Sequence, residues 1–302
     1  MVRAARVVLR SGEQPIPKPV TDLIRRRHST RAYVREPISE DARRALLAFL
    51  LANTDGPLGS RVRFELLAAT AESRDSLRGL GTYGFVRGAQ AFIAGAVGEA
   101  PKDLEDYGYL MERAVLRATD LGLGTCWLGG TFSKSGFARG IGLGAGEQLP
   151  AVVAVGYPVP GCETKDPLRR FASSASRLPG EELFFDGRWG IPLTAESAAA
   201  YGEVLEAVRW APSASNKQPW RIVRSGDDWH FFLRRSRGYR SKSRLVCLVG
   251  IADLQRVDMG IAMCHFGSTA DELRLGGRWR LDGRGVAASE GEAEYTVTWG
   301  AT

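Results

Sequence analysis

The stretch from Trp210 to Trp220 is WAPSASNKQPW, and it carries the strongest indication of fold and function in this sequence. Pro212 and Pro219 keep its backbone extended, because each proline ring fixes its own φ and biases the preceding residue away from helix. Its polar side chains exchange hydrogen bonds without carrying charge; they are Ser213, Ser215, Asn216 and Gln218. Such a loop suits a ligand with a polyol and a flat ring. The alternative is a helix-ending turn, but a turn needs only two or three such residues.

This stretch and a second one far upstream resemble two motifs of a known family. Residues 211–222, APSASNKQPWRI, are similar to the PSxxNxQPW signature of the FMN-dependent nitroreductases. The upstream segment resembles the basic-Ser-basic-aromatic segment of the same family; it contains Arg27, His28, Ser29, Thr30, Arg31, Ala32 and Tyr33. In ordinary members of the family both motifs lie close together near the N-terminus of one chain. The organisation of this chain must therefore explain why they are so far apart.

Composition and charge exclude several classes of function. The chain has 302 residues, of which 44% are apolar and 25% charged, as in a soluble protein of one large or two ordinary domains. The net charge of +7 comes from dispersed arginines without interleaved aromatic residues, so we expect no nucleic-acid partner. A positive field still favours an anionic nucleotide.

Cysteine, histidine and apolar patterns predict the compartment and exclude a metal. No apolar run approaches the roughly 18–20 residues of a membrane span, so we expect no membrane partner. The N-terminal apolar run is too short for a signal peptide. The four cysteines form no CxxC motif, which fits a reducing cytoplasm. With only three histidines and no His/Cys ligand spacing, no metal site is predicted.

Apolar spacing and turn residues predict alternating helices and strands. The predicted helices cover residues 20–27, 39–53, 103–122, 133–141, 197–210 and 253–275. The predicted strands cover residues 61–69, 89–98, 125–128, 149–156, 220–224, 229–233, 245–250 and 294–299, with one more around Trp279. Residues 220–233 are predicted to form a hairpin across Gly226. Four segments follow: an arm (1–20), a first half (21–160), a long connection (161–194) and a second half (195–302).

The two halves repeat each other. At an offset of 152 residues the aligned pairs include Val97-Gly98 on Val249-Gly250, Asp106 on Asp258, Gly108 on Gly260, Met111 on Met263 and Trp127 on Trp279. Shared helical periodicity alone would not align aspartate, glycine and tryptophan in one register, so we predict a duplication. Further upstream, an offset of 158 places residues 53–64 on residues 211–222, and the first copy lacks the Ser/Asn/Gln loop.

A duplication explains the spacing of the two motifs. Typical nitroreductases are homodimers that bind each flavin at the interface between subunits. The chain resembles the nitroreductases in which one chain contains a doubled nitroreductase fold, a fused pseudo-dimer. The resemblance implies an α+β fold, with a mainly antiparallel mixed sheet in each half and the helices at 103–122 and 253–275 packed centrally. One half then supplies the segment at residues 27–31 and the other supplies the loop at residues 212–218.

The resemblance also implies a role for each motif residue. Arg27 and Ser29, beside His28, would face the FMN phosphate, and Arg31 would lie near the pyrimidine edge of the ring. The alternative for this basic segment is a solvated charge run at the end of a helix. The remaining cofactor-binding residues implied are Tyr83, Gly129, Gly130, Arg177, Pro212, Ser213, Ala214, Ser215, Asn216 and Gln218. Arg169 and Arg170 compete with Arg177 for the phosphate, and all three could instead be solvated linker charges.

The implied function is an FMN oxidoreductase that passes hydride from NAD(P)H to a nitroaromatic, quinone or related acceptor. The flavin carries the redox chemistry, so no catalytic side chain is predicted. The alternatives are a non-catalytic flavin- or nucleotide-binding protein, or a specialised flavin enzyme such as a dehalogenase or a peptide-ring dehydrogenase. The partner is a small-molecule electron acceptor. The fused chain would act as a monomer or as a further homodimer.

Overall fold

The computed structural model describes residues 14–70, 77, 79–161, 176–237, 252–282 and 293–300. The helices are α1 (Val20–Arg26), α2 (Glu40–Ala52), α3 (Asp103–Asp120), α4 (Lys134–Gly140), α6 (Gly180–Leu183), α7 (Ala195–Ala198), α8 (Gly202–Arg209) and α10 (Leu254–Glu272), with 3-10 turns η3 (Ala199–Tyr201) and η4 (Ala214–Asn216). The strands are β1 (Val62–Ala68), β2 (Ala91–Gly98), β3 (Gly124–Leu128), β4 (Glu147–Gln148), β5 (Val152–Gly156), β6 (Phe184–Asp186), β7 (Trp220–Ser225), β8 (Asp228–Leu233), β9 (Arg278–Arg280) and β10 (Glu294–Gly300).

The first sheet has the strand order β1-β2-β5-β3, all antiparallel, and β4 pairs with the end of β2. Strand β2 is apolar along its length because both of its faces are buried. Ile93 and Val97 face the main core, which includes α2 and α3, whereas Phe92 and Ala94 face a smaller cluster around Phe137 of α4. Helices therefore cover both faces of this sheet.

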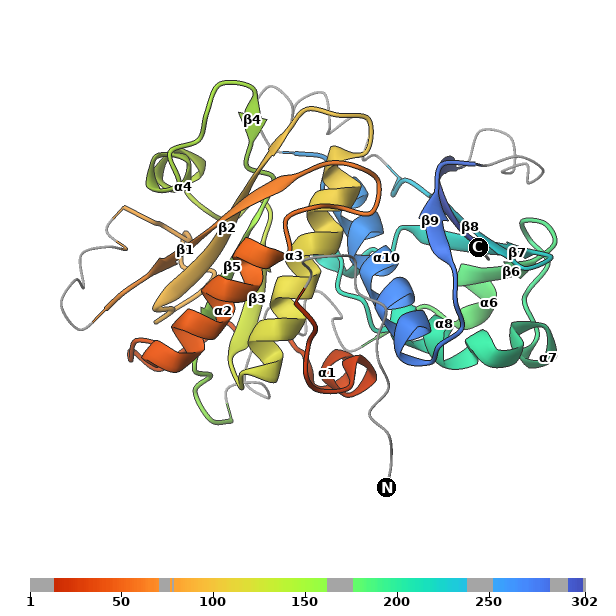
Figure 1. The fold of residues 1–302 in the computed structure, drawn as a ribbon, viewed down its shortest axis with the longest axis horizontal. Helices are drawn as coiled ribbons and strands as arrows, with labels where there is room; N and C mark the ends of the chain where they lie inside the picture. Colours follow the sequence, from red (N-terminus) through yellow and green to blue (C-terminus); the bar gives the residue numbers. More distant parts are fainter. Residues whose placement is uncertain are drawn as a thin grey trace.

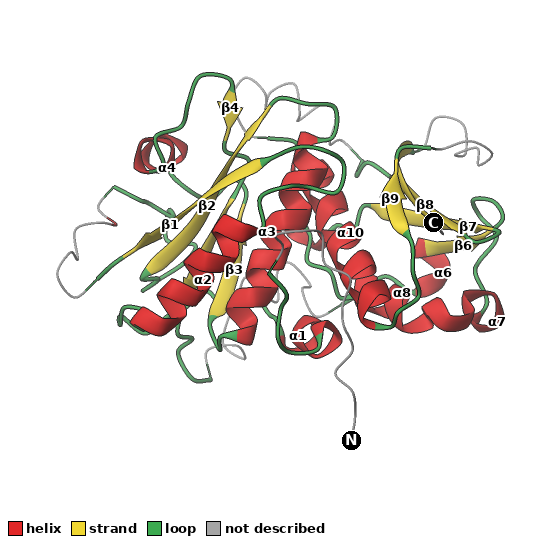
Figure 2. Ribbon diagram, in the orientation of Figure 1, coloured by secondary structure: helices red, strands yellow, loops and turns green. Residues whose placement is uncertain are grey.

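The second sheet has the order β6-β7-β8-β10-β9, in which β6 and β7 are parallel and the other pairs antiparallel. The β7–β8 hairpin turns at Gly226, whose φ of 61° suits glycine. An aromatic cluster joins this sheet to α10, with the Phe266 and Phe231 ring centroids 5.3 Å apart. In Figure 2 the two sheets lie at opposite ends of the molecule, with helices between them.

The two sheets share one topology. The order β1-β2-β5-β3 in the first half corresponds to β7-β8-β10-β9 in the second, and every pair in both series is antiparallel. In each half a helix leads into the first strand, and a long helix, α3 or α10, follows the second. The predicted α+β architecture of two similar halves is confirmed.

The long helices α3 and α10 pack against each other between the sheets, as predicted (Figure 1). The two backbones come close together at Gly108 and Gly260. A methyl group on Gly108 would collide with the Val257 carbonyl, and one on Gly260 would collide with the Glu105 carbonyl. Under the 152-residue offset each of these contacts maps onto the other, so the two helices meet as equivalent surfaces do at a twofold axis.

Three sequence predictions differ from the structure or fall outside it. The helix predicted over 197–210 is broken into α7, η3 and α8, because Ala199 adopts a left-handed φ of 46°. The predicted connection contains α6 and β6, and β6 joins the second sheet beside β7. The predicted strand 245–250 lies outside the described residues, and β8 holds the place that β2 has in the first half.

A local signal sets the start of helix α2. It begins after Ser39, whose hydroxyl accepts a hydrogen bond from the Ala42 amide at 3.2 Å, the arrangement of an N-cap. In the parts of the chain that the structure describes, no helix is both long and apolar enough to cross a bilayer.

Candidate functional site

The Pro212–Pro219 loop has an unusual backbone for a loop without glycine. Ser215, Asn216 and Gln218 all have left-handed φ values, between 48° and 53°. Such conformations cost about 1 kcal/mol or more each and persist only when the surroundings hold them. The Ser213 hydroxyl accepts the Gln218 amide at 2.9 Å, which closes the loop on itself.

Asp258 on α10 holds this loop through a hydrogen bond to its backbone. One of its carboxylate oxygens accepts the Ala214 amide at 2.9 Å. The other is buried without a hydrogen-bond partner among the described residues. Burial raises the pKa of Asp258 well above its usual range, although the amide bond opposes that shift. Asp258 aligns with Asp106 in the repeat.

Arg177 and its neighbours close the other side of the loop. The Arg177 guanidinium donates to Asn216 Oδ1 at 3.2 Å and to the Trp210 carbonyl at 3.4 Å, and it lies 5.6 Å from the centre of the Trp210 ring. The Leu178 amide donates to Gln218 Oε1 at 2.9 Å. The structure therefore brings Arg177 together with the loop. Arg169 and Arg170 lie outside the described residues.

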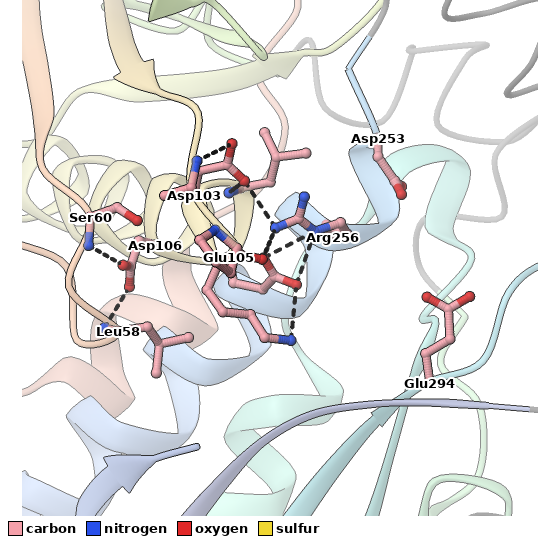
Figure 3. Close-up of polar contacts among 12 residues, drawn as sticks. Leu58, Ser60, Asp103, Glu105, Asp106, Asp253, Arg256 and Glu294 are labelled. Atoms are coloured by element: carbon pink, nitrogen blue, oxygen red, sulfur yellow. Dashed lines mark hydrogen bonds and ion pairs between the residues drawn. The ribbon is translucent and has the colours of Figure 1, made fainter.

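The first half contains a counterpart of this loop at residues 54–60. Asp106 on α3 accepts the amides of Leu58 at 2.8 Å and Ser60 at 2.7 Å (Figure 3). Burial raises the pKa of Asp106 to about 6, with the two amide bonds opposing the shift. Between residues 54 and 60 only Gly59 has a positive φ. Both aspartates thus hold the loop that leads into the first strand of their half.

The basic segment runs from the end of α1 along the first sheet. The Thr30 amide donates to the Thr125 carbonyl of β3 at 2.8 Å, and the Arg87 amide donates to the Arg31 carbonyl at 2.9 Å. Arg31 stacks over the Phe85 ring, 5.1 Å from its centre. Ser29 forms a bridge with Thr125. These contacts fix the backbone of the segment at the edge where β3 lies.

Arg27 meets a buried polar network that crosses between the halves. Its Nε atom is 3.9 Å from Glu112 Oε1 on α3, and both side chains are almost fully buried. The same Glu112 oxygen is 3.1 Å from His265 Nε2 on α10. His265 Nδ1 is 2.8 Å from the Ala207 carbonyl on α8, the helix that leads into the Pro212–Pro219 loop. The network thus connects the basic segment with the second half.

Gly129 packs against the first turn of α10. A methyl group there would lie 2.5 Å from a Leu254 side-chain carbon, so any larger residue would require that leucine side chain to move. Leu254, Asp258 and His265 lie within about 40° of each other around the helix, because each residue advances it by about 100°. One stripe of α10 therefore contacts Gly129, the loop at Ala214, and the network that reaches Arg27.

Other predicted residues are less closely tied to this stripe. Tyr83 is 74% exposed, with a φ of 47°, in the turn that contains Phe85. Gly130 is exposed. His28 directs its Nδ1 atom to the Arg26 carbonyl at 3.2 Å. The described residues contain no cluster of three or more His, Cys, Asp or Glu that could hold a metal ion.

Three residues of the candidate site had not been singled out for it from the sequence. Asp258 could have been found, because it aligns with Asp106 in the repeat. Each of these aspartates stands shortly before the glycine at which α3 and α10 cross. Glu112 and His265 gave no such signal, since neither aligns with a residue of its own type. Their contact depends on the crossing of α3 and α10.

Comparisons with known proteins show the family and the fold of this chain. Residues 19–270 match the model of a family described as "Putative TM nitroreductase". The chain belongs to this nitroreductase family. A solved structure described as a "putative nitroreductase", from Thermotoga maritima MSB8, covers 98% of this chain and 98% of its own, with 19% identity and a TM-score of 0.58. That likeness shows that the nitroreductase fold of this chain extends over both halves.

Two other solved structures overlap this chain over about half its length. One, from Desulfovibrio desulfuricans in complex with FMN, is 27% identical and covers 49% of this chain and 95% of its own, with a TM-score of 0.37. Another, from Bacteroides fragilis NCTC 9343 with bound FMN, is 23% identical and covers 48% of this chain and 90% of its own, with a TM-score of 0.36. No curated protein matches the sequence.

Proposed function

We propose that this nitroreductase-family protein is an FMN-dependent oxidoreductase that transfers hydride from NAD(P)H to a nitroaromatic, quinone or related acceptor. The observation that carries the proposal is the stripe on α10. Leu254, Asp258 and His265 contact, directly or through Glu112, the three segments that the family resemblance assigns to the cofactor. The stripe is about 16 Å long, which is comparable to an extended mononucleotide.

The donor groups along this stripe fit FMN. Guanidinium groups at the Arg27 end suit a phosphate dianion, because charge-assisted hydrogen bonds to phosphate are strong. Hydroxyl and amide side chains of the Pro212–Pro219 loop suit the ribityl chain and the polar edge of the ring. Gly129 allows a backbone to approach a flat ring closely. Arg27, Ser29, Ser213 and Asn216 would hold the cofactor.

Bound FMN would supply the two-electron chemistry, accepting hydride from one substrate and releasing it to another. The chain would bind FMN, orient it and tune its electrostatic surroundings. The strained loop is held by Asp258, Ser213 and Gln218, so its polar side chains are in place before a ligand arrives, which lowers the entropy lost on binding. Arg31, stacked on Phe85, would add positive charge near the ring.

Because both halves contribute, we propose that one chain forms a complete site without a second subunit. The second pseudo-symmetric site would lack the polar loop, since residues 54–60 are TDGPLGS. It would also lack an Arg-His-Ser-Thr-Arg segment from the second half. The electron acceptor is a small molecule in this proposal.

The direct test is to purify the protein and titrate it anaerobically with NADH and NADPH. Bound oxidised flavin absorbs near the blue end of the visible spectrum, and the proposal predicts that this absorbance is lost on addition of at least one of the two nucleotides. Addition of a nitroaromatic or a quinone should then restore it. A protein that keeps its yellow colour under both nucleotides would support the non-catalytic flavin-binding alternative. A colourless protein that binds no added FMN would overturn the proposal.

A further inference from the structure

Every polar atom of Gln218 has a partner within the chain. Its backbone amide donates to the Ser213 hydroxyl at 2.9 Å, and its carbonyl accepts the Arg221 guanidinium at 2.9 Å. Its side-chain Oε1 accepts the Leu178 amide at 2.9 Å, and its Nε2 donates to the Asn216 carbonyl at 3.3 Å. Only 3% of the residue is exposed. The Gln218 side chain is therefore occupied inside the protein, where it holds the segment that contains Leu178.

Leu178 is held at both of its backbone groups. Its amide donates to Gln218, and its carbonyl accepts Arg209 Nε of α8 at 3.2 Å. The Ser176 carbonyl, two residues earlier, accepts another side-chain amide of the loop at 3.1 Å. These bonds lie on both sides of Arg177 in the sequence, so they fix the backbone from which its side chain extends.

Arg177 lies where the second half meets the basic segment of the first. Its guanidinium donates to the Trp210 carbonyl at the end of α8, at 3.4 Å. The network that reaches Arg27 contacts the Ala207 carbonyl, about one turn earlier in the same helix. Trp210 and Ala207 also line one small cavity with Ile24 of α1, the helix that leads into Arg27. Both arginines thus belong to the region where the phosphate is proposed to bind.

We propose that Gln218 is a positioning residue that fixes Leu178 and thereby places the Arg177 guanidinium for the phosphate of the cofactor. Arg209 holds Leu178 in the same way from α8. Charge-assisted bonds from a guanidinium to a phosphate depend on geometry, so a fixed backbone favours them. This inference rests on the proposed FMN function. It gives Gln218, which the family resemblance implies to bind the cofactor, an action through Arg177 instead of a direct contact.

The equivalent residue of the first half acts within its own half. Ser60 takes the place of Gln218 in the repeat, and its amide donates to Asp106 at 2.7 Å. Its short side chain bonds the same aspartate. Gln218 instead reaches the segment that connects the two halves. Ser60 is therefore a matched control for Gln218, because both end a loop that leads into the first strand of their half.

The test compares the affinities of the full-length apo-protein for FMN and for riboflavin, which lacks the phosphate. Quenching of flavin fluorescence would give both dissociation constants. Gln218→Met keeps the length of the side chain and removes the acceptor of the Leu178 amide. We expect it to weaken FMN binding about tenfold and riboflavin binding by no more than about twofold. Arg177→Gln should give the same pattern.

A double variant separates an action through Arg177 from a direct contact with the flavin. If Gln218 acts through Arg177, Q218M/R177Q should bind FMN within about twofold of R177Q alone. Losses that multiply in the double variant, or equal weakening of FMN and riboflavin in Q218M, would overturn the inference. An unchanged FMN affinity in either single variant would overturn it as well.

Arg209→Met loosens Leu178 from outside the loop. The Arg209 side chain is 29% exposed, so its replacement should leave the protein folded. We expect FMN binding to weaken about threefold and riboflavin binding to stay unchanged. If Q218M cannot be purified, R209M decides, and an unchanged FMN affinity would overturn the inference.

Two controls keep this test apart from that of the proposed function. Ser60→Ala should leave the FMN-to-riboflavin ratio unchanged, and a loss as large as that of Q218M would overturn the inference. A wild-type protein that binds neither flavin, or does not prefer FMN, would refute the FMN function itself. A wild-type preference for FMN that persists unchanged in Q218M would refute only the role of Gln218.

Discussion

The loops at residues 54–60 and 212–219 occupy equivalent places in the two halves, yet they differ in backbone and in anchoring. Asp106 holds the first loop with two amide bonds, and that loop uses a single positive φ, at a glycine. Asp258 holds the second with one amide bond, and three residues other than glycine there are left-handed. A left-handed backbone at residues other than glycine is strained, and such strain is typical of functional sites. This difference supports the proposal that one loop serves the structure and the other serves binding.

The largest expected loss of stability is at the crossing of α3 and α10, where the two halves make equivalent contacts. Gly260→Ala would place a methyl group against the Glu105 carbonyl, and Gly108→Ala would place one against the Val257 carbonyl. Each variant should lower the free energy of unfolding by more than about 3 kcal/mol, because backbone cannot move away as a side chain can. Urea unfolding would measure both.

The control for these variants is Gly202→Ala at the start of α8. A methyl group there would meet nothing within 4 Å, so its effect should be neutral or slightly stabilising. A pseudo-twofold crossing also requires that Gly108→Ala and Gly260→Ala cost similar amounts. A large difference between the two would count against the equivalence of α3 and α10.

Charged contacts across the halves come next in size. Arg256 on α10 binds Glu105 at 2.6 Å and Asp103 at 2.9 Å on α3, and both carboxylates are almost fully buried (Figure 3). Arg256→Gln would leave Asp103 without this cation and Glu105 with only Lys102, 3.8 Å away, and should cost about 3 kcal/mol. The exposed Arg43–Glu40 pair of α2 is the matched control, and Arg43→Gln should cost less than about 0.5 kcal/mol. Equal losses in the two variants would show that Arg256 contributes no more than a surface pair.

The two anchoring aspartates give a test by pH. Each has a folded-state pKa above its unfolded value, so the folded protein keeps the proton to higher pH and loses stability as the pH rises through that window. For Asp106 the window runs from about pH 4 to about pH 6, and Asp106→Asn should remove a fall of about 3 kcal/mol across it. Asp258→Asn should likewise remove a fall in stability that begins as the pH rises above the unfolded pKa of an aspartate.

Urea unfolding at several pH values would measure both falls in stability. A wild-type profile that Asp258→Asn leaves unchanged would contradict the raised pKa of Asp258. A profile that rises with pH between pH 4 and pH 6 in the wild type, and is unaffected by Asp106→Asn, would contradict the raised pKa of Asp106.

Asn216 and Leu58 are counterparts in the repeat and should separate binding from stability. Asn216→Gly removes the side chain that bonds Arg177 and the Ser176 carbonyl but tolerates the left-handed backbone, so FMN affinity should fall about tenfold with little loss of stability. Leu58→Ala should lower stability and leave FMN affinity unchanged, since Leu58 packs against the core. Fluorescence titration and urea unfolding would measure the two effects. The reverse pattern would mean that the functional roles of the loops had been exchanged.

The smallest expected effect concerns the helix that leads into each loop. Helix α2 is continuous, whereas the corresponding region of the second half is broken at Ala199, whose φ of 46° strains a residue with a side chain. Ala199→Gly should therefore raise the free energy of unfolding by about 0.5–1 kcal/mol. Ala48→Gly, within the continuous α2, should lower it by about as much. A loss of stability in both would show that Ala199 is not strained.

These comparisons also show how far the sequence could predict the molecule. Apolar spacing located α3 and α10 because each is long, and aligned Asp, Gly and Trp pairs revealed the repeat before any contact was known. The break at Ala199 was not visible, since the surrounding alanines favour helix and the left-handed turn comes from tertiary packing. Strand β6 was missed because three residues are too few to show a period.

The candidate site was predictable only in part, because some of its contacts depend on tertiary packing. Arg177 and the Pro212–Pro219 loop carried local signals, and the structure brings them into contact. Glu112 and His265 interact only because α3 crosses α10, and no spacing in the sequence encodes that meeting. Residues that act across a helix crossing are specified by the whole fold, whereas a loop motif is specified by its neighbours.

The proposed function requires that two unlike halves form one cofactor site within a single chain. The most direct measurement is the number of FMN molecules released by heat per chain, from the absorbance of the supernatant and the protein concentration after reconstitution with excess FMN and removal of the unbound flavin. We expect one FMN molecule per chain. Two flavins per chain would show that the loop at residues 54–60 also serves a site, and none would show that the halves do not form one together.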